Sequence, residues 1–249
     1  MKRARVMVDG VVHAATERDG QVVLDDGRRL WQDQVRWLTP LMPLERPRTI
    51  LALGLNYRDH AKELSFKPPE EPLVFLKGER SLIGHRETTQ RPAGVQTMHY
   101  ECELAVVIGR KAKKVKREDA YAYVAGYTVA NDYAVRDYLE NWYRPNLRVK
   151  NRDGATPLGP WLVDAADVPD PMALALKTTV NGKLTQQGHT KDMIFDVPFL
   201  IEYFTSFMTL NPGDVILTGT PDGVVDCQPG DVVVCEIEGV GALMNTIAA

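Results

Sequence analysis

The sequence has 249 residues, 44% hydrophobic and 25% charged, as is usual for a globular protein that can bury a sizeable core. The formal net charge of −3 gives no reason to expect a nucleic acid or an anionic membrane as partner. Three cysteines without a C-x-x-C pair indicate neither a disulfide framework nor a thiolate zinc site, and no stretch approaches the ~20 apolar residues of a membrane span, so we expect a cytoplasmic protein.

The pattern of residues 1–45 indicates short strands separated by turns. Asp-Gly pairs separate the apolar runs VMV, VVHAA, QVVL and RRLWQ, and such pairs suit tight turns between antiparallel strands. A proline-rich passage, PLMPLERP, follows at 40–47. We therefore predict a small N-terminal β subdomain over 1–45, followed by a larger domain over 46–249.

The larger domain mixes strands with a few helices. Helices are predicted over 57–64, 117–125, 133–143 and 197–207. Pro-Gly turns introduce the last strands, because proline and glycine suit the two central positions of a type II turn. These strands are expected to be antiparallel and to cover 215–218, 231–237 and 242–247.

The predicted fold class is α+β and β-rich. Helices do not alternate regularly with strands, and neither a G-x-G-x-x-G nor a Walker-type loop is present, which argues against a doubly wound nucleotide-binding fold. We expect a mixed β-sandwich or roll with a few flanking helices and the small N-terminal β subdomain.

Two glutamates, Glu101 and Glu103, open the apolar run of HYECELAVVIGR at 99–110. Side chains alternate along a strand, so both glutamates share one face, which continues as Ala105 and Val107. The pair could lie on the exposed end of an edge strand. Burial would instead cost several kcal/mol for each carboxylate or raise a pKa, and a divalent cation would remove that cost.

A cation bound by carboxylates alone would be a hard ion, so Mg²⁺ or Mn²⁺ is favoured over zinc, and Ca²⁺ is an option. The best candidate for a third ligand is Asp132 in GYTVANDYAVRDY, where an apolar strand is predicted to give way to a helix. An aspartate at that position also suits a helix cap. The spacing leaves both roles open.

Other residues suited to chemistry are His60, Glu63 and Lys150. His60 and Glu63 are three residues apart on a predicted helix and would share a face as an acid–base dyad, although a surface histidine often has such a neighbour by chance. Lys150 lies between two apolar stretches. The loop LTGTPDGV at 217–224 could present backbone N–H groups and a hydroxyl to an anion, or it could be only a turn.

Six motifs together resemble the fumarylacetoacetate hydrolase superfamily from about residue 48 to the C-terminus. They are GLNYRDHAKE, PLVFLKG, HYECELAVVIG, AGYTVANDYAVRD, the Lys150 segment ending PLGPWLV, and NPGDVILTGTPDGV. Their fixed order over some 200 residues makes the likeness far more specific than any single motif would.

The resemblance implies roles for particular residues. It makes Glu101, Glu103 and Asp132 the metal ligands, and His60 with Glu63 the acid–base pair on a segment that orders over the bound ligand. It implies that Lys150 contacts the substrate near the metal, and that Thr220 in the Gly219 region contacts a substrate carboxylate.

Within the superfamily, three segments are similar to the metal-binding half of isomerase/decarboxylases of homoprotocatechuate catabolism. They are FKPPEEPLVFLK, NDYAVRDYLENWYRPNLRVKNRDG and FMTLNPGD. The implied reaction is metal-dependent decarboxylation or keto–enol isomerisation of an unsaturated 2-oxo acid with two or three carboxylates. A hydrolase of the acylpyruvate or fumarylpyruvate type and a non-catalytic ion-binding protein are the alternatives.

The chain departs from the enterobacterial pattern, in which two related halves are fused in tandem. Here one half follows a short N-terminal β segment, and we expect a homodimer to supply the missing neighbour. Residues 78–94 are also individual to this chain, and we expect them to shape the pocket.

Overall fold

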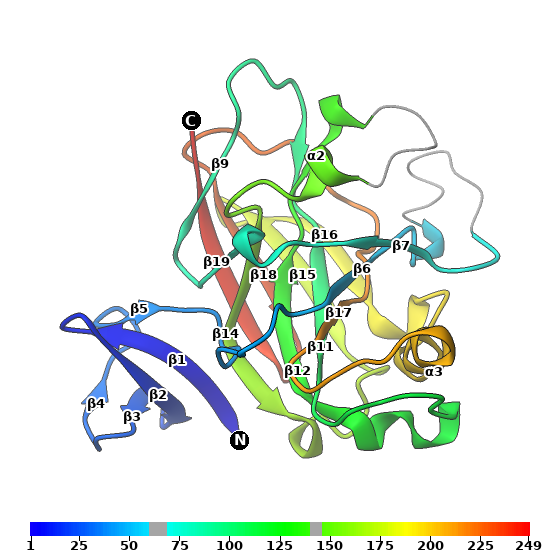
Figure 1. Ribbon diagram of the computed structural model, residues 1–249. Coiled ribbons are helices and arrows are strands. Elements are labelled where there is room, and N and C mark those ends of the chain that lie inside the picture. Colours follow the sequence, from blue (N-terminus) through cyan, green and yellow to red (C-terminus); the bar gives the residue numbers. More distant parts are fainter. Residues whose placement is uncertain (60–68, 140–145) are drawn as a thin grey trace.

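The computed structural model describes residues 1–59, 69–139 and 146–249, and its architecture is dominated by two sheets (Figure 1). Within these residues, the larger sheet has 12 strands in the order β4-β3-β2-β1-β14-β12-β11-β17-β6-β7, with β5 paired to β1 and β8 to β14. Its strands are β1 (Lys2–Val8), β2 (Val11–Arg18), β3 (Gln21–Leu24), β4 (Arg29–Leu30), β5 (Arg36–Trp37), β6 (Ile50–Gly54), β7 (Leu73–Leu76), β8 (Leu82–Ile83), β11 (Cys102–Ile108), β12 (Val124–Asn131), β14 (Thr156–Asp164) and β17 (Val215–Leu217).

The second sheet has five strands in the order β16-β15-β18-β19-β9. They are β9 (Thr88–Gln90), β15 (Ala175–Val180), β16 (Lys183–His189), β18 (Val232–Ile237) and β19 (Gly241–Ala248), and a separate small pair consists of β10 (Met98–His99) and β13 (Ala134–Val135). The helices that lie wholly within the described residues are α2 (Leu147–Lys150) and α3 (Val197–Phe207), with 3-10 helices η1 (Glu79–Ser81), η2 (Arg117–Tyr123), η3 (Arg136–Tyr138), η4 (Ala165–Asp167) and η5 (Thr190–Asp192). The predicted β-rich α+β fold is confirmed.

Strand β11 is buried on both faces, which explains its unbroken apolar sequence. One face, with Leu104 and Val106, joins the main core together with Leu243 of the second sheet. The opposite face, with Ala105 and Val107, joins a smaller core on the other side. Because β11 pairs with β12 on one edge and with β17 on the other, it is not an edge strand. The edge-strand interpretation of the glutamate pair is therefore wrong.

Helix α3 is confirmed over its whole predicted range. Its N-cap is Asp196, whose side chain accepts a hydrogen bond from the backbone N–H of Phe199 at 2.8 Å. Such a cap satisfies one of the N–H groups that a helix start leaves without a partner. Leu200, Ile201 and Phe204 then form the buried face.

Other predicted elements need correction. Instead of a helix over 133–143, the described part of this range holds strand β13 and the 3-10 helix η3. The predicted helix over 117–125 is a 3-10 helix that gives way to β12. Of the last three strands, β18 and β19 pair antiparallel as expected. Strand β17 instead joins the larger sheet, parallel to β6 and antiparallel to β11. Most of the helix predicted over 57–64 lies outside the described residues.

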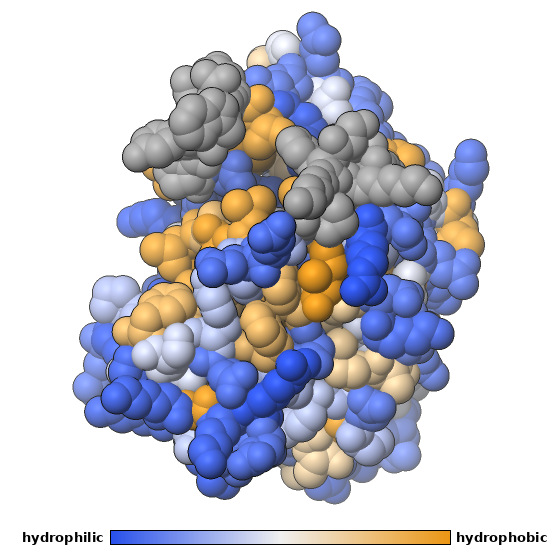
Figure 2. Space-filling view, turned by 90° about the vertical axis from the view of Figure 1, so that its right-hand side faces the viewer, coloured by the Kyte–Doolittle hydropathy of each residue, from blue (hydrophilic) through white to orange (hydrophobic). Residues whose placement is uncertain are grey.

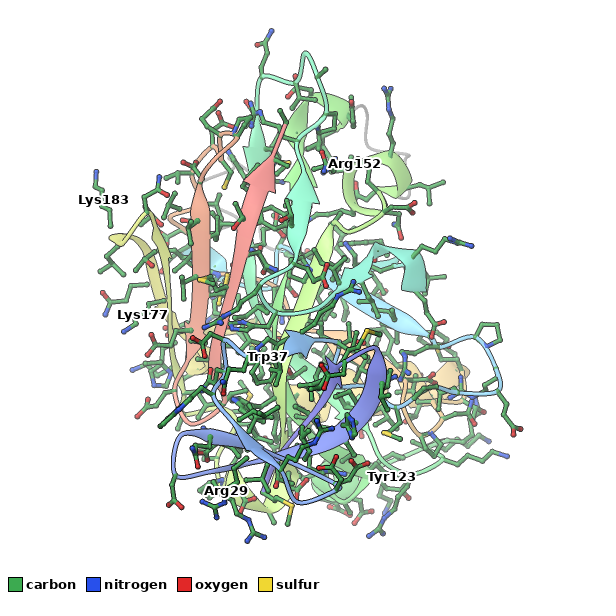
Figure 3. All side chains as sticks on the ribbon, turned by 90° about the vertical axis from the view of Figure 1, so that its left-hand side faces the viewer. Arg29, Trp37, Tyr123, Arg152, Lys177 and Lys183 are labelled. Carbon is green, nitrogen blue, oxygen red and sulfur yellow. The ribbon has the colours of Figure 1, made fainter. Side chains whose placement is uncertain are left out.

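The N-terminal strands extend the larger sheet, because β1 pairs with β14. Trp37 packs edge-on against Trp161 and His85, with ring centroids 4.9 Å and 5.3 Å apart, where these strands meet the main body (Figure 3). The division into a 1–45 subdomain and a 46–249 domain remains a prediction.

Residues 78–94 connect the two sheets. Within them, β8 pairs parallel with β14 and β9 pairs parallel with β19. Arg91 anchors the end of the segment by donating to the backbone carbonyls of Val95, Gln96 and Cys227 and to the carboxylate of Asp226. The segment thus has a structural role in this fold.

Candidate metal centre and substrate site

Three carboxylates converge where β11 begins and β12 ends. One oxygen atom of each of Glu101, Glu103 and Asp132 lies within 4.8 Å of the others. The strand register produces this meeting, because Cys102 faces Asn131 across the β11–β12 pair, so that the residues on either side are also neighbours. The backbone N–H of Asp132 donates to the carbonyl of Glu101 at 2.9 Å.

The three carboxylates are removed from water. Glu101 is 6% exposed, and Glu103 and Asp132 are 0% exposed. Burial, and then the negative charges of Asp132 and Glu101, raises the pKa of Glu103 well above its usual value. Burying a carboxylate costs free energy unless a nearby cation compensates its negative charge.

Three basic side chains face these carboxylates. The ammonium nitrogen Nζ of Lys150 lies 2.6 Å from Oε2 of Glu101 and 3.0 Å from Oδ2 of Asp132. The guanidinium of Arg136 donates to Oε1 of Glu101 at 2.7 Å. Lys77 pairs with Oδ1 of Asp132 and donates to the backbone carbonyl of Lys150 at 2.5 Å.

The two buried ammonium groups differ in their pKa shifts. Burial lowers the pKa of Lys150, but the charges of Asp132 and Glu101 more than offset this effect, so that its pKa is raised. For Lys77, burial prevails over the attraction of Asp132, and the pKa is lowered. Lys150 is therefore the more firmly charged partner of the carboxylates.

The carboxylate group fits a divalent cation. In the described part of the chain, the buried Oε1 of Glu103 has no hydrogen-bond partner, and Oδ2 of Asp132 has only its ion contact with Lys150. Oxygen ligands without cysteine or histidine suit a hard ion such as Mg²⁺, Mn²⁺ or Ca²⁺. The helix-cap interpretation of Asp132 is wrong, because β13 rather than a helix follows it.

The loop after β17 contacts the carboxylate of Glu103. The backbone N–H of Gly219 donates to Oε2 of Glu103 at 2.7 Å. Gly219 has a positive φ of 86°, and a Cβ there would lie 2.9 Å from Cβ of Asn56, so only glycine fits without strain. Thr220 follows directly and is buried.

The structure thus brings together the predicted Glu101, Glu103, Asp132, Lys150 and the Gly219–Thr220 pair, while His60 and Glu63 lie outside the described residues. The sequence interpretation missed Lys77 and Arg136. A signal for both was present, since Lys77 ends the apolar run of PLVFLKG and Arg136 comes four residues after Asp132.

The chain matches a known protein family and a curated relative. Residues 49–248 match the family model described as fumarylacetoacetate (FAA) hydrolase C-terminal. The chain is 61% identical over 205 residues to the 4-hydroxyphenylacetate degradation bifunctional isomerase/decarboxylase of Salmonella dublin, covering 82% of this chain and 48% of the relative. The chain therefore spans about half the length of this curated relative.

Solved structures of similar fold match this chain over its whole length. The 5-carboxymethyl-2-hydroxymuconate delta-isomerase of Mycobacterium smegmatis superposes with a TM-score of 0.87 and 37% identity, covering 100% of this chain and 98% of that chain. A maleylpyruvate hydrolase from Sphingobium, solved with manganese(II) and pyruvate, has a TM-score of 0.84 and 28% identity over 100% and 99% of the two chains. Among the helices of the described residues, none is long and apolar enough to cross a membrane.

Proposed function

Because the chain belongs to the fumarylacetoacetate hydrolase family, we propose that it is a divalent-metal-dependent enzyme that decarboxylates or isomerises an unsaturated 2-oxo acid carrying two or three carboxylates. The substrate would belong to 4-hydroxyphenylacetate catabolism, which the name of the Salmonella dublin relative gives, and to the homoprotocatechuate pathway, which the sequence motifs resemble. The observation that carries the proposal is the buried group of Glu101, Glu103 and Asp132, faced by Lys150.

Glu101, Glu103 and Asp132 would hold the cation, with Mg²⁺ favoured and Mn²⁺ or Ca²⁺ as alternatives. When bound, the cation would act as a Lewis acid that stabilises negative charge on the oxo oxygen of the substrate. Once all three carboxylates are ionised, the charges of Lys77, Lys150 and Arg136 offset theirs, so a bound divalent cation would leave two positive charges to attract an anionic substrate.

The remaining residues would bind and orient the substrate. Lys150 would hold a carboxylate or enolate oxygen of the substrate, which its place beside Glu101 supports. The hydroxyl of Thr220 and the adjacent Gly219 backbone would hold a substrate carboxylate. In the proposed reaction a C=C bond conjugates the oxo group to the carbon that loses CO₂, so the electron pair of the breaking C–C bond is delocalised as a dienolate.

His60 and Glu63 are proposed as the proton carriers on the basis of the sequence motif. After CO₂ leaves, the remote carbon of the dienolate must gain a proton, and a histidine paired with a carboxylate suits that transfer at neutral pH. The same dyad could activate water, which is how a hydrolase of the acylpyruvate or fumarylpyruvate type would use this site.

We also propose that the chain forms a homodimer and is cytoplasmic. A homodimer would supply a second copy of the catalytic half, since the relative is about twice as long as the matched segment. Edge strand β7 offers apolar surface for such a contact, with Leu73 and Leu76 48% and 60% exposed. Figure 2, which views the side carrying β7 and α3, shows hydrophobic residues grouped within a largely hydrophilic face. A cytoplasmic location belongs to the same proposal.

A substrate panel tests the function. The purified chain is given 5-carboxymethyl-2-oxo-hex-3-ene-1,7-dioate, its decarboxylated dienol and an acylpyruvate, each with Mg²⁺ and then with excess chelator. We expect CO₂ release from the first and conversion of the dienol to its 2-oxo form, both abolished by the chelator. Pyruvate formation from the acylpyruvate without CO₂ release from the diacid would favour the hydrolase. Metal binding without turnover of any substrate would favour the non-catalytic ion-binding protein.

A further inference from the structure

Gln186 is a buried amide on β16 that reaches across to the loop carrying Thr220. Its Nε2 donates to Oγ1 of Thr220 at 2.9 Å and to the backbone carbonyl of Pro221 at 2.8 Å. Its Oε1 accepts from the hydroxyl of Thr178 at 2.9 Å. Gln186 lies in the second sheet, whereas the ligand residues belong to the larger one.

The directions of these hydrogen bonds follow from chemistry. A backbone carbonyl can only accept, so the atom of Gln186 that faces Pro221 must be the NH₂ nitrogen. The same nitrogen faces Thr220, whose hydroxyl oxygen therefore accepts. The hydroxyl hydrogen of Thr220 is then available to another acceptor, because within the described residues this hydroxyl is seen only as the acceptor of the Gln186 hydrogen bond.

Strand β16 and the loop that carries Thr220 pack too closely for the hydrogen bonds of Gln186 to rearrange. A Cβ on Gly188 would lie 2.6 Å from Cγ of Pro221, and a Cβ on Gly223 would lie 2.8 Å from the carbonyl oxygen of Thr185. The loop is also tied to the metal centre, since the N–H of Gly219 donates to Glu103. Thr220 is thus held between β16 and a candidate metal ligand.

We infer that Gln186 is a positioning residue that fixes the Thr220 hydroxyl as a hydrogen-bond donor to the carboxylate of a 2-oxo acid. The inference rests on the proposed function, from which the carboxylate role of Thr220 is taken. Gln186 itself touches neither the substrate nor the cation. Its loss leaves the hydroxyl free to rotate, so that donating to the carboxylate costs orientational freedom that Gln186 had already removed.

Pyruvate binding in the presence of saturating Mg²⁺ tests this inference by calorimetry on the full chain. Gln186→Met removes the donor at similar size, and Thr220→Val removes the hydroxyl. The matched control is Gln187→Met, since Gln187 is exposed on the opposite face of β16. We expect each of the first two variants to bind pyruvate about 10-fold more weakly, as for loss of a hydrogen bond to a charged group.

Two further readouts separate positioning from general damage. The Mg²⁺ affinity of Gln186→Met should stay close to that of the control, even though its thermal midpoint falls because the Pro221 carbonyl and the Thr178 hydroxyl lose a buried partner. The double variant should bind pyruvate no more weakly than Thr220→Val alone, because both changes remove one interaction. Additive losses, or pyruvate binding by Gln186→Met that equals that of the control, would overturn the inference.

A measurement on the unmutated chain covers the case in which Gln186→Met does not fold. Pyruvate with Mg²⁺ should shift the side-chain amide resonances of Gln186, and unshifted resonances at saturation would contradict its role. Pyruvate binding without turnover of the proposed substrates would refute the function while leaving the inference standing. Failure of the unmutated chain to bind pyruvate would refute the role of Thr220 and the inference with it.

Discussion

Glu103 is fully buried, and this burial, together with the nearby charges of Asp132 and Glu101, raises its pKa well above the usual value. A divalent cation ligated there needs the ionised carboxylate, so the cation and the proton compete for one site. The consequence can be measured in two ways, by changing the residue and by changing the pH.

Glu103→Gln removes the charge at nearly constant shape. We expect Mg²⁺ and Mn²⁺ affinity, measured by calorimetry, to fall on the order of 100-fold. Even the mutation of residues that only support a metal ligand lowers metal affinity about 10–100-fold. Glu238→Gln, which changes an exposed glutamate in the turn between β18 and β19, is the matched control. Equal affinity in the two variants would remove Glu103 from the ligand set.

The pH dependence of metal binding has a definite sign. Because the pKa of Glu103 is raised, its carboxyl carries a proton at pH values where ordinary carboxyls are ionised, and cation binding must release that proton. Affinity for Mg²⁺ should therefore increase as the pH rises above the range in which ordinary carboxyls titrate, with protons released in calorimetry across buffers of different ionisation enthalpy. Constant affinity without proton release would contradict this assignment.

His60 is the residue whose role rests on sequence alone. His60→Ala should keep Mg²⁺ affinity but lose turnover by about 100-fold or more, the usual contribution of a positioned acid–base group. His189→Ala changes a histidine at the end of β16 and serves as the control. Undiminished turnover in His60→Ala would show that another group carries the proton.

Glu101, Glu103 and Asp132 could be singled out as candidate metal ligands because their signal is local, although the spacing alone also allowed an edge-strand pair and a helix cap. Two glutamates on one face of an apolar strand are visible in a few letters of sequence, and Asp132 directly follows the next strand. Lys77 and Arg136 stand at noticeable positions in the sequence, but the local signal does not say which carboxylates they pair with. They meet Asp132 and Glu101 across 55 and 35 positions of the chain, so their role depends on the sheet register.

At the scale of elements, the range 133–138 shows where local pattern fails. Its residues suit a helix, yet Ala134 and Val135 pair with β10. The carboxylate of Asp137 accepts from the backbone N–H groups of Gln96 and Thr97 at 2.7 and 2.8 Å. These partners lie far away in the sequence. The strand pairing and the hydrogen bonds that they make outweigh a helix propensity worth only tenths of a kcal/mol per residue.

The segment 78–94 yields a prediction at the same scale. Arg91 is buried and supplies donors to three backbone carbonyls and to Asp226. Arg91→Met removes the donor from the buried carbonyl of Cys227 and from three part-buried acceptors, so we expect a loss of about 3 kcal/mol in the free energy of unfolding. Denaturant unfolding measures this loss against exposed Arg110→Met, and matching midpoints would contradict the anchoring role.

At the scale of the whole molecule, the fold class could be predicted and the sheet membership could not. Alternating apolar runs and turn signals indicated a β-rich α+β protein, as observed. Strand β17 follows a Pro-Gly turn just as β18 does, but it inserts between β11 and β6 of the larger sheet. Sequence spacing does not specify which distant strands become neighbours.

Assembly is also tested at this scale. If a second copy supplies the missing neighbour, light scattering after size exclusion should give about twice the 27.8 kDa mass of the chain. The proposed dimer needs apolar contact, so the mass should not depend on salt over a range that screens surface charges. A single-chain mass at assay concentrations would refute the homodimer.

The central claim is that one divalent cation is shared by Glu101, Glu103 and Asp132, and anomalous diffraction from crystals grown with Mn²⁺ tests it most directly. We predict a single strong anomalous peak about 2.2 Å from one oxygen of each of the three carboxylates. The peak should be absent from Glu103→Gln crystals treated identically. An unmutated crystal without a peak there, or with Mn²⁺ held only by other residues, would contradict the account.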